Sequence, residues 1–125
     1  MIINISEKNF EKYSRQIMME KIGVNGQKKI MKSSICIIGC GGLGTTTAQY
    51  LAMTGVGKIL LVDFDNIELS NLNRQISFLE TDIGKNKAET LKKNILKINA
   101  ELDVSVIKKK ITKRISIYFW TNLNL

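Results

Sequence analysis

Three glycines of the segment GCGGLG stand at the GxGxxG spacing that can bring a phosphate close to the backbone. In this spacing Gly39 permits a tight exit from a strand, Gly41 lets a phosphate approach, and Gly44 allows the next helix to lie close to the sheet. A helix beginning near Leu43 would direct unpaired N–H groups and the positive end of its dipole toward an anion. The spacing also occurs by chance, so its meaning depends on the residues around it.

Asp63 is a carboxylate that could bind the ribose of a nucleotide. It follows the apolar segment KILLV (58–62) and stands 19 positions after Gly44. At that place in a strand, turn, helix and strand unit, an acidic side chain accepts hydrogen bonds from ribose hydroxyls. Together with the glycines, Asp63 predicts a nucleotide site. The alternative is structural: the glycines form a tight turn and Asp63 caps a loop.

Polar side chains crowd the segment that begins at Asp63, where an open α/β sheet binds its ligand. They are Asp63, Asp65, Ser70, Asn71, Asn73, Arg74 and Gln75. Arg74 offers a planar fork of donors for phosphate oxygens, and Lys87 adds a cation at the start of the next predicted helix. The cluster favours a triphosphate over the NAD or FAD of an oxidoreductase, the competing function. For Arg74 a surface salt bridge, and for Lys87 a solvated position, are the simpler alternatives.

Composition excludes several other classes of function. With 125 residues and 44% apolar content, the chain suits a single domain. Its net charge of +8 comes from 16 Lys and 3 Arg, but the lysines are scattered and only 6% of residues are aromatic, so we expect no nucleic-acid partner. With no His and two Cys, the chain cannot assemble a four-ligand Cys/His zinc site or use imidazole catalysis.

The chain carries no signal for a membrane or an oxidising compartment. No apolar stretch approaches the roughly 20 residues needed to cross a bilayer. Cys36 and Cys40 do not form a disulfide pattern, and the N-terminus lacks the features of a secretion signal. We therefore expect a cytoplasmic protein that does not insert into a membrane.

Apolar periodicity predicts the elements that would position these residues. In order they are helices over 7–20 and 24–31, a strand over 35–38, a helix over 43–54, a strand over 58–62, a polar loop over 64–84, a helix over 88–99 and a strand over 102–107. The continuous apolar run at 35–38 is typical of a strand buried on both faces. This order predicts the N-terminal part of a Rossmann-like, doubly wound parallel α/β sheet, preceded by one or two short helices.

From about Phe10 to Ile107 the chain resembles the ThiF, MoeB and HesA group of adenylyltransferases, which are related to ubiquitin-activating enzymes. The motifs that carry the resemblance are YSRQI (13–17), GCGGLG (39–44), YLAMTGVGKILLVDFD (50–65), LSNLNRQ (69–75), DIGKNKAE (82–89) and IN (98–99). It implies a homodimer that joins AMP to the C-terminal Gly carboxylate of a ubiquitin-like sulfur-carrier protein. NFEKYSRQI and NLNRQISF are closer to ThiF, which serves ThiS in thiamine biosynthesis, than to MoeB, which serves MoaD in molybdopterin biosynthesis.

Carried over by position, the resemblance also implies a role for each site residue. Gly42 and Asp63 would hold the adenosine part of ATP. Arg74 and Asn71 would contact the phosphates, within a wall formed by Ser70, Asn71, Leu72 and Asn73. Lys87 would neutralise the pyrophosphate, and Arg15 would reach across the dimer to the other subunit's ATP. Catalysis would then rest on charge stabilisation by Arg74, Lys87 and Arg15.

Three features of the group have no counterpart in this sequence. They are an Asp-Asn motif whose Asp binds Mg²⁺, two CxxC pairs for zinc, and a sulfur-handling Cys. The ending RISIYFWTNLNL (114–125) also departs from the group. We therefore expect an incomplete ATP-binding domain over 1–110 and an aberrant tail over 111–125 caused by truncation. ATP and Mg²⁺ would be the cofactors, without zinc, and catalysis would be impaired; a nucleotide-binding or dimerising module without catalysis is the alternative.

Overall fold

Three short apolar strands build a parallel sheet at the centre of the molecule. The computed structural model describes residues 4–112, in which β1 (Ser34–Ile38), β2 (Lys58–Val62) and β3 (Asp103–Ile107) are arranged in the order β1-β2-β3. In register, Ile35 lies opposite Ile59, and Ile59 lies opposite Val104. The predicted strands and their parallel pairing are confirmed, with ends that differ by one residue at most.

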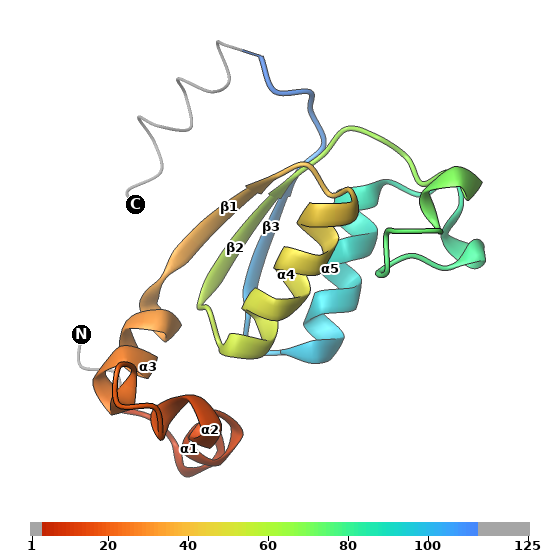
Figure 1. Cartoon of the computed structure of the whole chain (residues 1–125). Helices are drawn as coiled ribbons and strands as arrows, with labels where there is room; N and C mark the ends of the chain where they lie inside the picture. The colour runs from red at the N-terminus through yellow and green to blue at the C-terminus, as the bar shows by residue number, and fades with distance from the viewer. Residues whose placement is uncertain (1–3, 113–125) are drawn as a thin grey trace.

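The two longest helices, α4 (Gly42–Thr54) and α5 (Lys87–Ile98), cover the same face of the sheet (Figure 1). Each connects neighbouring parallel strands in the same direction across the sheet, so right-handed crossovers place both on one side. Gly55 ends α4 with φ +89°, a left-handed conformation that favours glycine. The α/β Rossmann-type fold is confirmed, and residues 4–112 form the first winding of the expected doubly wound sheet.

The main core lies between this face and the two helices. Its buried side chains include Ile37, Ile59, Leu61, Val104, Ala48, Ala52, Leu91 and Ile95. On the opposite face, Leu60 and Val62 pack with Cys36, Ile107 and Ile111. The expectation that residues 35–38 are buried on both faces is wrong for the described part of the chain, where Ile38 is 61% exposed. The reason is that β1 is an edge strand and the helices cover one face only.

The expected single helix over 7–20 is divided into two. α1 (Glu7–Lys12) and α2 (Ser14–Ile17) are separated by Tyr13, and α3 (Gly23–Lys32) follows, so three short helices precede β1 instead of one or two. Tyr13 is only 3% exposed. Its ring lies so close to Gly55 that a Cβ there would be 2.6 Å from the ring Cζ. The bend at Tyr13 therefore seats its ring at the end of α4, a contact that helical periodicity does not reveal.

Two glutamines fix the N-terminal helices at the same end of α4. Gln16 donates from Nε2 to the Thr54 carbonyl oxygen at 3.0 Å, and Gln27 donates to the same oxygen at 3.0 Å. Gln16 also donates to Gln27 Oε1 at 2.7 Å. Figure 1 shows these helices at the end of the sheet opposite the turn between β1 and α4. Across residues 4–112, no helix is long and apolar enough to cross a bilayer.

Candidate nucleotide site

The turn between β1 and α4 is shaped by two glycines. Gly39 has φ +94°, a left-handed conformation that side chains rarely adopt. A Cβ on Gly44 would lie 1.8 Å from the Gly39 carbonyl oxygen, so the first turn of α4 lies directly on the strand exit. At Gly41 a Cβ would have only Gln75 Nε2 nearby, at 3.9 Å. The backbone around Gly41 is thus open to a ligand, while Gly44 is enclosed.

Asp63 ties the end of β2 to this turn. The Cys40 N–H donates to Asp63 Oδ2 at 2.7 Å, and the Asp65 N–H donates to Oδ1 at 2.8 Å. The side chain is buried. The structural alternative for this carboxylate, loop capping, is therefore present in the fold. Each carboxylate oxygen can accept more than one hydrogen bond, so the predicted ribose contact is compatible with this geometry.

Arg74 lies beside the glycine turn, although it is 32 positions after Gly42 in the sequence. A Cβ on Gly42 would be 3.6 Å from Arg74 Cγ and 3.8 Å from its carbonyl oxygen. Nη1 donates to the Ser70 carbonyl at 3.0 Å and to Asn73 Oδ1 at 2.8 Å, and the residue is exposed. A guanidinium has five N–H donors. The two hydrogen bonds of Nη1 therefore hold the Arg74 side chain in place and leave other N–H donors free beside the N-terminus of α4.

The remaining wall residues shape the loop that carries Arg74. This loop contains two single 3₁₀ turns, η1 (Leu69–Asn71) and η2 (Glu80–Asp82). Asn71 is 7% exposed, and its Oδ1 accepts from the Glu68 N–H at 2.8 Å. Leu72 packs against the main core. Asn71 and Leu72 thus help to fix the loop, and the predicted phosphate contacts of Asn71 and Arg74 stay a prediction.

Lys87 is a buried cation at the start of α5. It is 8% exposed, and its Nζ lies 3.7 Å from Asp65 Oδ2. A positive charge is unfavourable at a helix N-terminus, where the dipole is already positive, and burial adds to the cost. Asp65 offsets part of this cost, but its side chain is 50% exposed. An anionic ligand at the strand ends would stabilise Lys87 further.

Gln75 is a site residue to which the sequence assigned no role. It is 3% exposed, and its buried Oε1 has no hydrogen-bond partner among residues 4–112. An unpaired buried acceptor costs about 1–3 kcal/mol. The Nε2 of the same amide is the atom that borders the glycine turn, 3.9 Å from the position that a Cβ on Gly41 would take. Its place in the cluster LSNLNRQ is the signal in the sequence, but its burial is not visible there.

Asn86 is a second residue near the site to which the sequence assigned no role. Its Oδ1 accepts from the Glu89 N–H at 3.1 Å and caps α5. Its Nδ2 donates to the carbonyl oxygens of Asp63 and Asp65, at 3.3 and 3.2 Å. Asn three positions before Glu is a helix-start signal, which could have identified the cap. Asn86 thereby joins the start of α5 to the loop after β2.

A hollow of about 230 Å³ lies next to Asp63, on the side of Phe64 and Ile111. Its apolar lining comes from Ile38, Val62, Phe64 and Ile111, and its polar lining includes Asp63, Asp65 and Lys109. An apolar hollow beside a carboxylate suits a flat base whose ribose meets the carboxylate. The base, ribose and phosphate groups of one nucleotide could therefore follow the strand ends toward Arg74.

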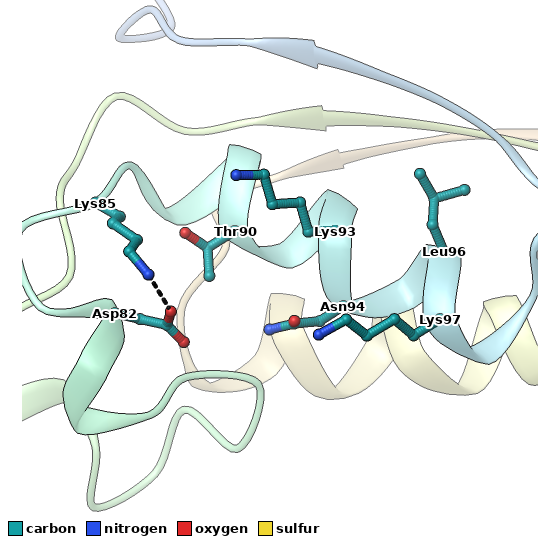
Figure 2. Close-up of a pocket in the computed structure, with 7 residues that line it drawn as sticks. All are labelled: Asp82, Lys85, Thr90, Lys93, Asn94, Leu96 and Lys97. Carbon is teal, nitrogen blue, oxygen red and sulfur yellow. Dashed lines mark hydrogen bonds and ion pairs between the residues drawn. The ribbon is translucent and has the colours of Figure 1, made fainter.

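A separate hollow of about 460 Å³ lies against α5 (Figure 2). It is lined by Asp82, Lys85, Thr90, Lys93, Asn94, Leu96 and Lys97. Lys85 donates to Asp82 Oδ1 at 2.9 Å, and this hydrogen bond lowers the pKa of Asp82. The lining shares no residue with the glycine turn. The hollow is therefore not part of the nucleotide site.

Arg15 is the one predicted site residue that lies away from the others. It is exposed on α2, next to Gln16, which is bound to the last residue of α4. The glycine turn lies at the first residue of α4, and a helix of 13 residues is about 20 Å long. The helix α2, which carries Arg15, thus lies at the far end of α4 from the glycine turn (Figure 1). Within one chain it does not join the nucleotide site.

Residues 4–112 offer no set of metal ligands. No group of three or more Cys, Asp or Glu side chains in that part of the chain could hold a metal ion. Cys36 packs on the outer face of the sheet with Leu60, whereas Cys40 belongs to the main core. The described residues therefore do not fit a zinc site. Mg²⁺ is commonly held by one or two carboxylates together with the nucleotide's own phosphates.

Cys40 is expected to be inert toward thiol reagents. It is fully buried, and burial, followed by the nearby Asp63 carboxylate, raises its pKa from 9.0 to about 12. At pH 8 the thiolate population would be about a thousandfold lower than in the unfolded chain. Alkylation followed by peptide mass spectrometry should label the half-buried Cys36 first. Equal labelling of both cysteines in the folded protein would contradict the burial of Cys40.

Known proteins resemble this chain in both sequence and fold. The ThiF family profile matches residues 13–125. The sulfur carrier protein ThiS adenylyltransferase of Escherichia coli is 39% identical over 108 residues, which are 86% of this chain and 43% of that protein. The adenylyltransferase and sulfurtransferase MOCS3 of Xenopus laevis is 45% identical over 89 residues, or 71% of this chain and 20% of that protein.

Solved structures give the same result. The E. coli tRNA threonylcarbamoyladenosine dehydratase TcdA, in complex with AMP, superposes with a TM-score of 0.82 at 31% identity, covering 97% of this chain and 49% of that one. The same enzyme in complex with ATP gives a TM-score of 0.84. The chain spans less than half the length of each of these relatives. Since the family profile extends from Tyr13 through the glycine turn, the Arg74 loop and Lys87, the chain belongs to the ThiF family.

Proposed function

We propose that this chain is the ATP-binding part of an adenylyltransferase that activates the C-terminal carboxylate of a ubiquitin-like sulfur-carrier protein. The observation that carries the proposal is that Arg74 and the buried Gln75 border the glycine turn, while the buried Lys87 lies beside Asp65 at the start of α5. A helix N-terminus can bind the pyrophosphate of NAD as well as the phosphates of ATP, but two added cations suit the greater negative charge of a triphosphate. The ATP and AMP complexes of TcdA support the same ligand class.

The proposed reaction needs charge stabilisation more than proton transfer. A terminal carboxylate is already ionised near pH 7, so its oxygen can attack the α-phosphorus without a general base. The bond from that phosphorus to the bridging oxygen breaks, and pyrophosphate leaves with the bonding electrons. Negative charge then grows where Arg74, Lys87 and the start of α4 can stabilise it. The absence of His from the chain is compatible with this chemistry.

The partner is proposed to be a carrier of the ThiS type, used in thiamine biosynthesis in the cytoplasm, with a MoaD-type carrier as the alternative. The similarity to the E. coli ThiS adenylyltransferase supports this choice. We also propose a homodimer in which Arg15 serves the other subunit's nucleotide. Its support is the position of Arg15, which lies about one helix length from its own glycine turn and is exposed at the surface.

Calorimetry with the purified chain tests the proposed function. We expect ATP with Mg²⁺ to bind, and NAD to bind weakly or not at all, because NAD lacks the terminal phosphates that Arg74 and Lys87 would meet. Exchange of labelled pyrophosphate into ATP, measured with a sulfur-carrier protein, separates an adenylyltransferase from a binding module without catalysis. Tight NAD binding in the absence of ATP binding would favour the oxidoreductase alternative.

Replacing Arg74 by alanine should weaken ATP binding while leaving AMP binding little changed. Loss of a charge-assisted contact to phosphate costs roughly 1.5–3 kcal/mol, which corresponds to a Kd increase of about 10- to 150-fold. Because Arg74 is exposed, the fold should remain intact, as circular dichroism can verify. An equal loss of affinity for ATP and AMP would show that Arg74 does not face the outer phosphates.

A further inference from the structure

Ser77 is held from two sides, although it lies in the long loop between β2 and α5. Gln49 of α4 donates from Nε2 to Ser77 Oγ, and Asn94 of α5 donates from Nδ2 to the Ser77 carbonyl oxygen. Ser77 is 6% exposed, while the preceding Ile76 is 61% exposed. These two hydrogen bonds, which we call the Ser77 clamp, fasten the loop to both helices.

The position of the clamp links it to the nucleotide site. Ser77 follows Arg74 and Gln75 by three and two positions. Between the two 3₁₀ turns the described loop contains no helix or strand, and its backbone hydrogen bonds from Arg74 and Gln75 to Asn71 and from Phe78 to Gln75 are local ones. Gln49 lies two helical turns from Gly42, and Asn94 lies two turns from Lys87, since a turn takes about 3.6 residues. The clamp therefore joins the Arg74–Gln75 segment to the two helices whose N-termini form the site.

Both clamp side chains are amides on the outer part of their helices that reach across to the loop. Asn94 is half-buried on α5 and lines the hollow beside that helix. Figure 2 shows its amide directed toward the loop segment that carries Asp82. Gln49 is likewise half-buried and directs its amide across to the loop. Each of the two side chains thus uses a donor to hold Ser77.

We propose that Gln49 and Asn94 are positioning residues that set Arg74 and Gln75 against the glycine turn. This inference rests on the proposed function, because the expected consequence of their loss is a lower affinity for ATP. Without the clamp, the carboxyl side of this segment keeps the buried Phe78 ring and the hydrogen bond from the Phe78 N–H to the Gln75 carbonyl at 3.1 Å, but loses both hydrogen bonds to α4 and α5. The Arg74 guanidinium and the Gln75 amide are then positioned beside the glycine turn for a smaller fraction of the time.

Two nearly isosteric substitutions test the clamp. In Asn94→Asp the amide donor becomes a carboxylate, which cannot donate to the Ser77 carbonyl and repels it. In Gln49→Glu the new carboxylate can accept a hydrogen bond from the Ser77 hydroxyl, so the contact is kept with its direction reversed. We expect Asn94→Asp to raise the Kd for ATP about 3- to 10-fold, the usual worth of one hydrogen bond, and Gln49→Glu to bind nearly as the unaltered chain does.

Val104→Ala is the matched control for a purely structural effect. Val104 is 7% exposed, packs in the main core, and pairs with Ile59 near the start of β3, away from the carboxyl ends of the strands. This variant should lower the unfolding temperature without changing the Kd for ATP of the folded protein. Gln49→Ala serves as a second disrupting variant if Asn94→Asp does not fold, and it should raise the Kd similarly.

The outcomes separate this inference from the proposed function. If the unaltered 125-residue chain binds no ATP in calorimetry, the proposed function and the clamp's role fall together. If it binds ATP and both Asn94→Asp and Gln49→Ala keep the same Kd, only the positioning role is overturned. If Val104→Ala raises the Kd as much as Asn94→Asp does, the effect is general destabilisation and the role is likewise overturned.

Discussion

Replacement of Gly44 by alanine is expected to distort the glycine turn and to destabilise the fold strongly. The added Cβ would lie 1.8 Å from the Gly39 carbonyl oxygen and 2.9 Å from its carbon, both of them backbone atoms. No side-chain rotation relieves such contacts, so α4 must move away from β1. Overpacking of a core commonly costs 1–3 kcal/mol and sometimes more, and we expect about 3 kcal/mol or more here. Urea unfolding followed by circular dichroism measures the loss.

Two other glycines provide the controls. At Gly84, φ is +88° but no atom lies within 4 Å of the position that a Cβ would take, so Gly84→Ala should show only the strain of a left-handed residue, roughly 1–2 kcal/mol. At Gly41 the conformation is extended and the space is open, so Gly41→Ala should fold normally and lose ATP affinity. A Gly44→Ala protein with unchanged stability would contradict the close packing of α4 on the strand exit.

The strands and long helices could be predicted because their signals are local. The run ICII and the segment KILLV are short and apolar, and Ala88, Leu91 and Ile95 repeat at helical spacing on one face of α5. Neither property depends on distant residues. The break at Tyr13 does, because it follows from the contact with Gly55, 42 positions later. A tertiary contact of this kind overrides helical periodicity.

The residues of the candidate site likewise divide into those that local spacing predicts and those that depend on distant contacts. Gly39, Gly44 and Asp63 could be assigned from spacing, since each acts within one strand, turn, helix and strand unit. The spacing did not show that Asp63 already binds the Cys40 N–H. It also could not show the burial of Gln75 or the Ser77 clamp, which joins residues 28 and 17 positions apart. These features depend on how the loop folds back over α4 and α5.

Mixed dimers are expected to recover half of the ATP sites that two separate substitutions remove. In an Arg15→Ala dimer both sites lack the arginine from the other subunit, and in an Arg74→Ala dimer both lack their own. Each loss should raise the Kd about 10- to 150-fold, the usual effect of one charge-assisted contact. In a mixed dimer one site keeps both arginines while the other lacks both, so about half of the tight sites should return.

This complementation follows from the position of α2, because Tyr13 and Gln16 fasten it to the end of α4 that is farthest from the glycine turn. Calorimetric stoichiometry of mixed and unmixed dimers, with the mixed species isolated by two affinity tags, measures the recovery. Tyr13→Ala should weaken ATP binding as Arg15→Ala does, since it frees the helix that presents Arg15. A monomeric chain that binds ATP with the same Kd before and after Arg15→Ala would exclude a role for Arg15 across a dimer. Recovery of tight sites in the mixed dimer alone can arise only if Arg15 and Arg74 of different subunits meet at one nucleotide.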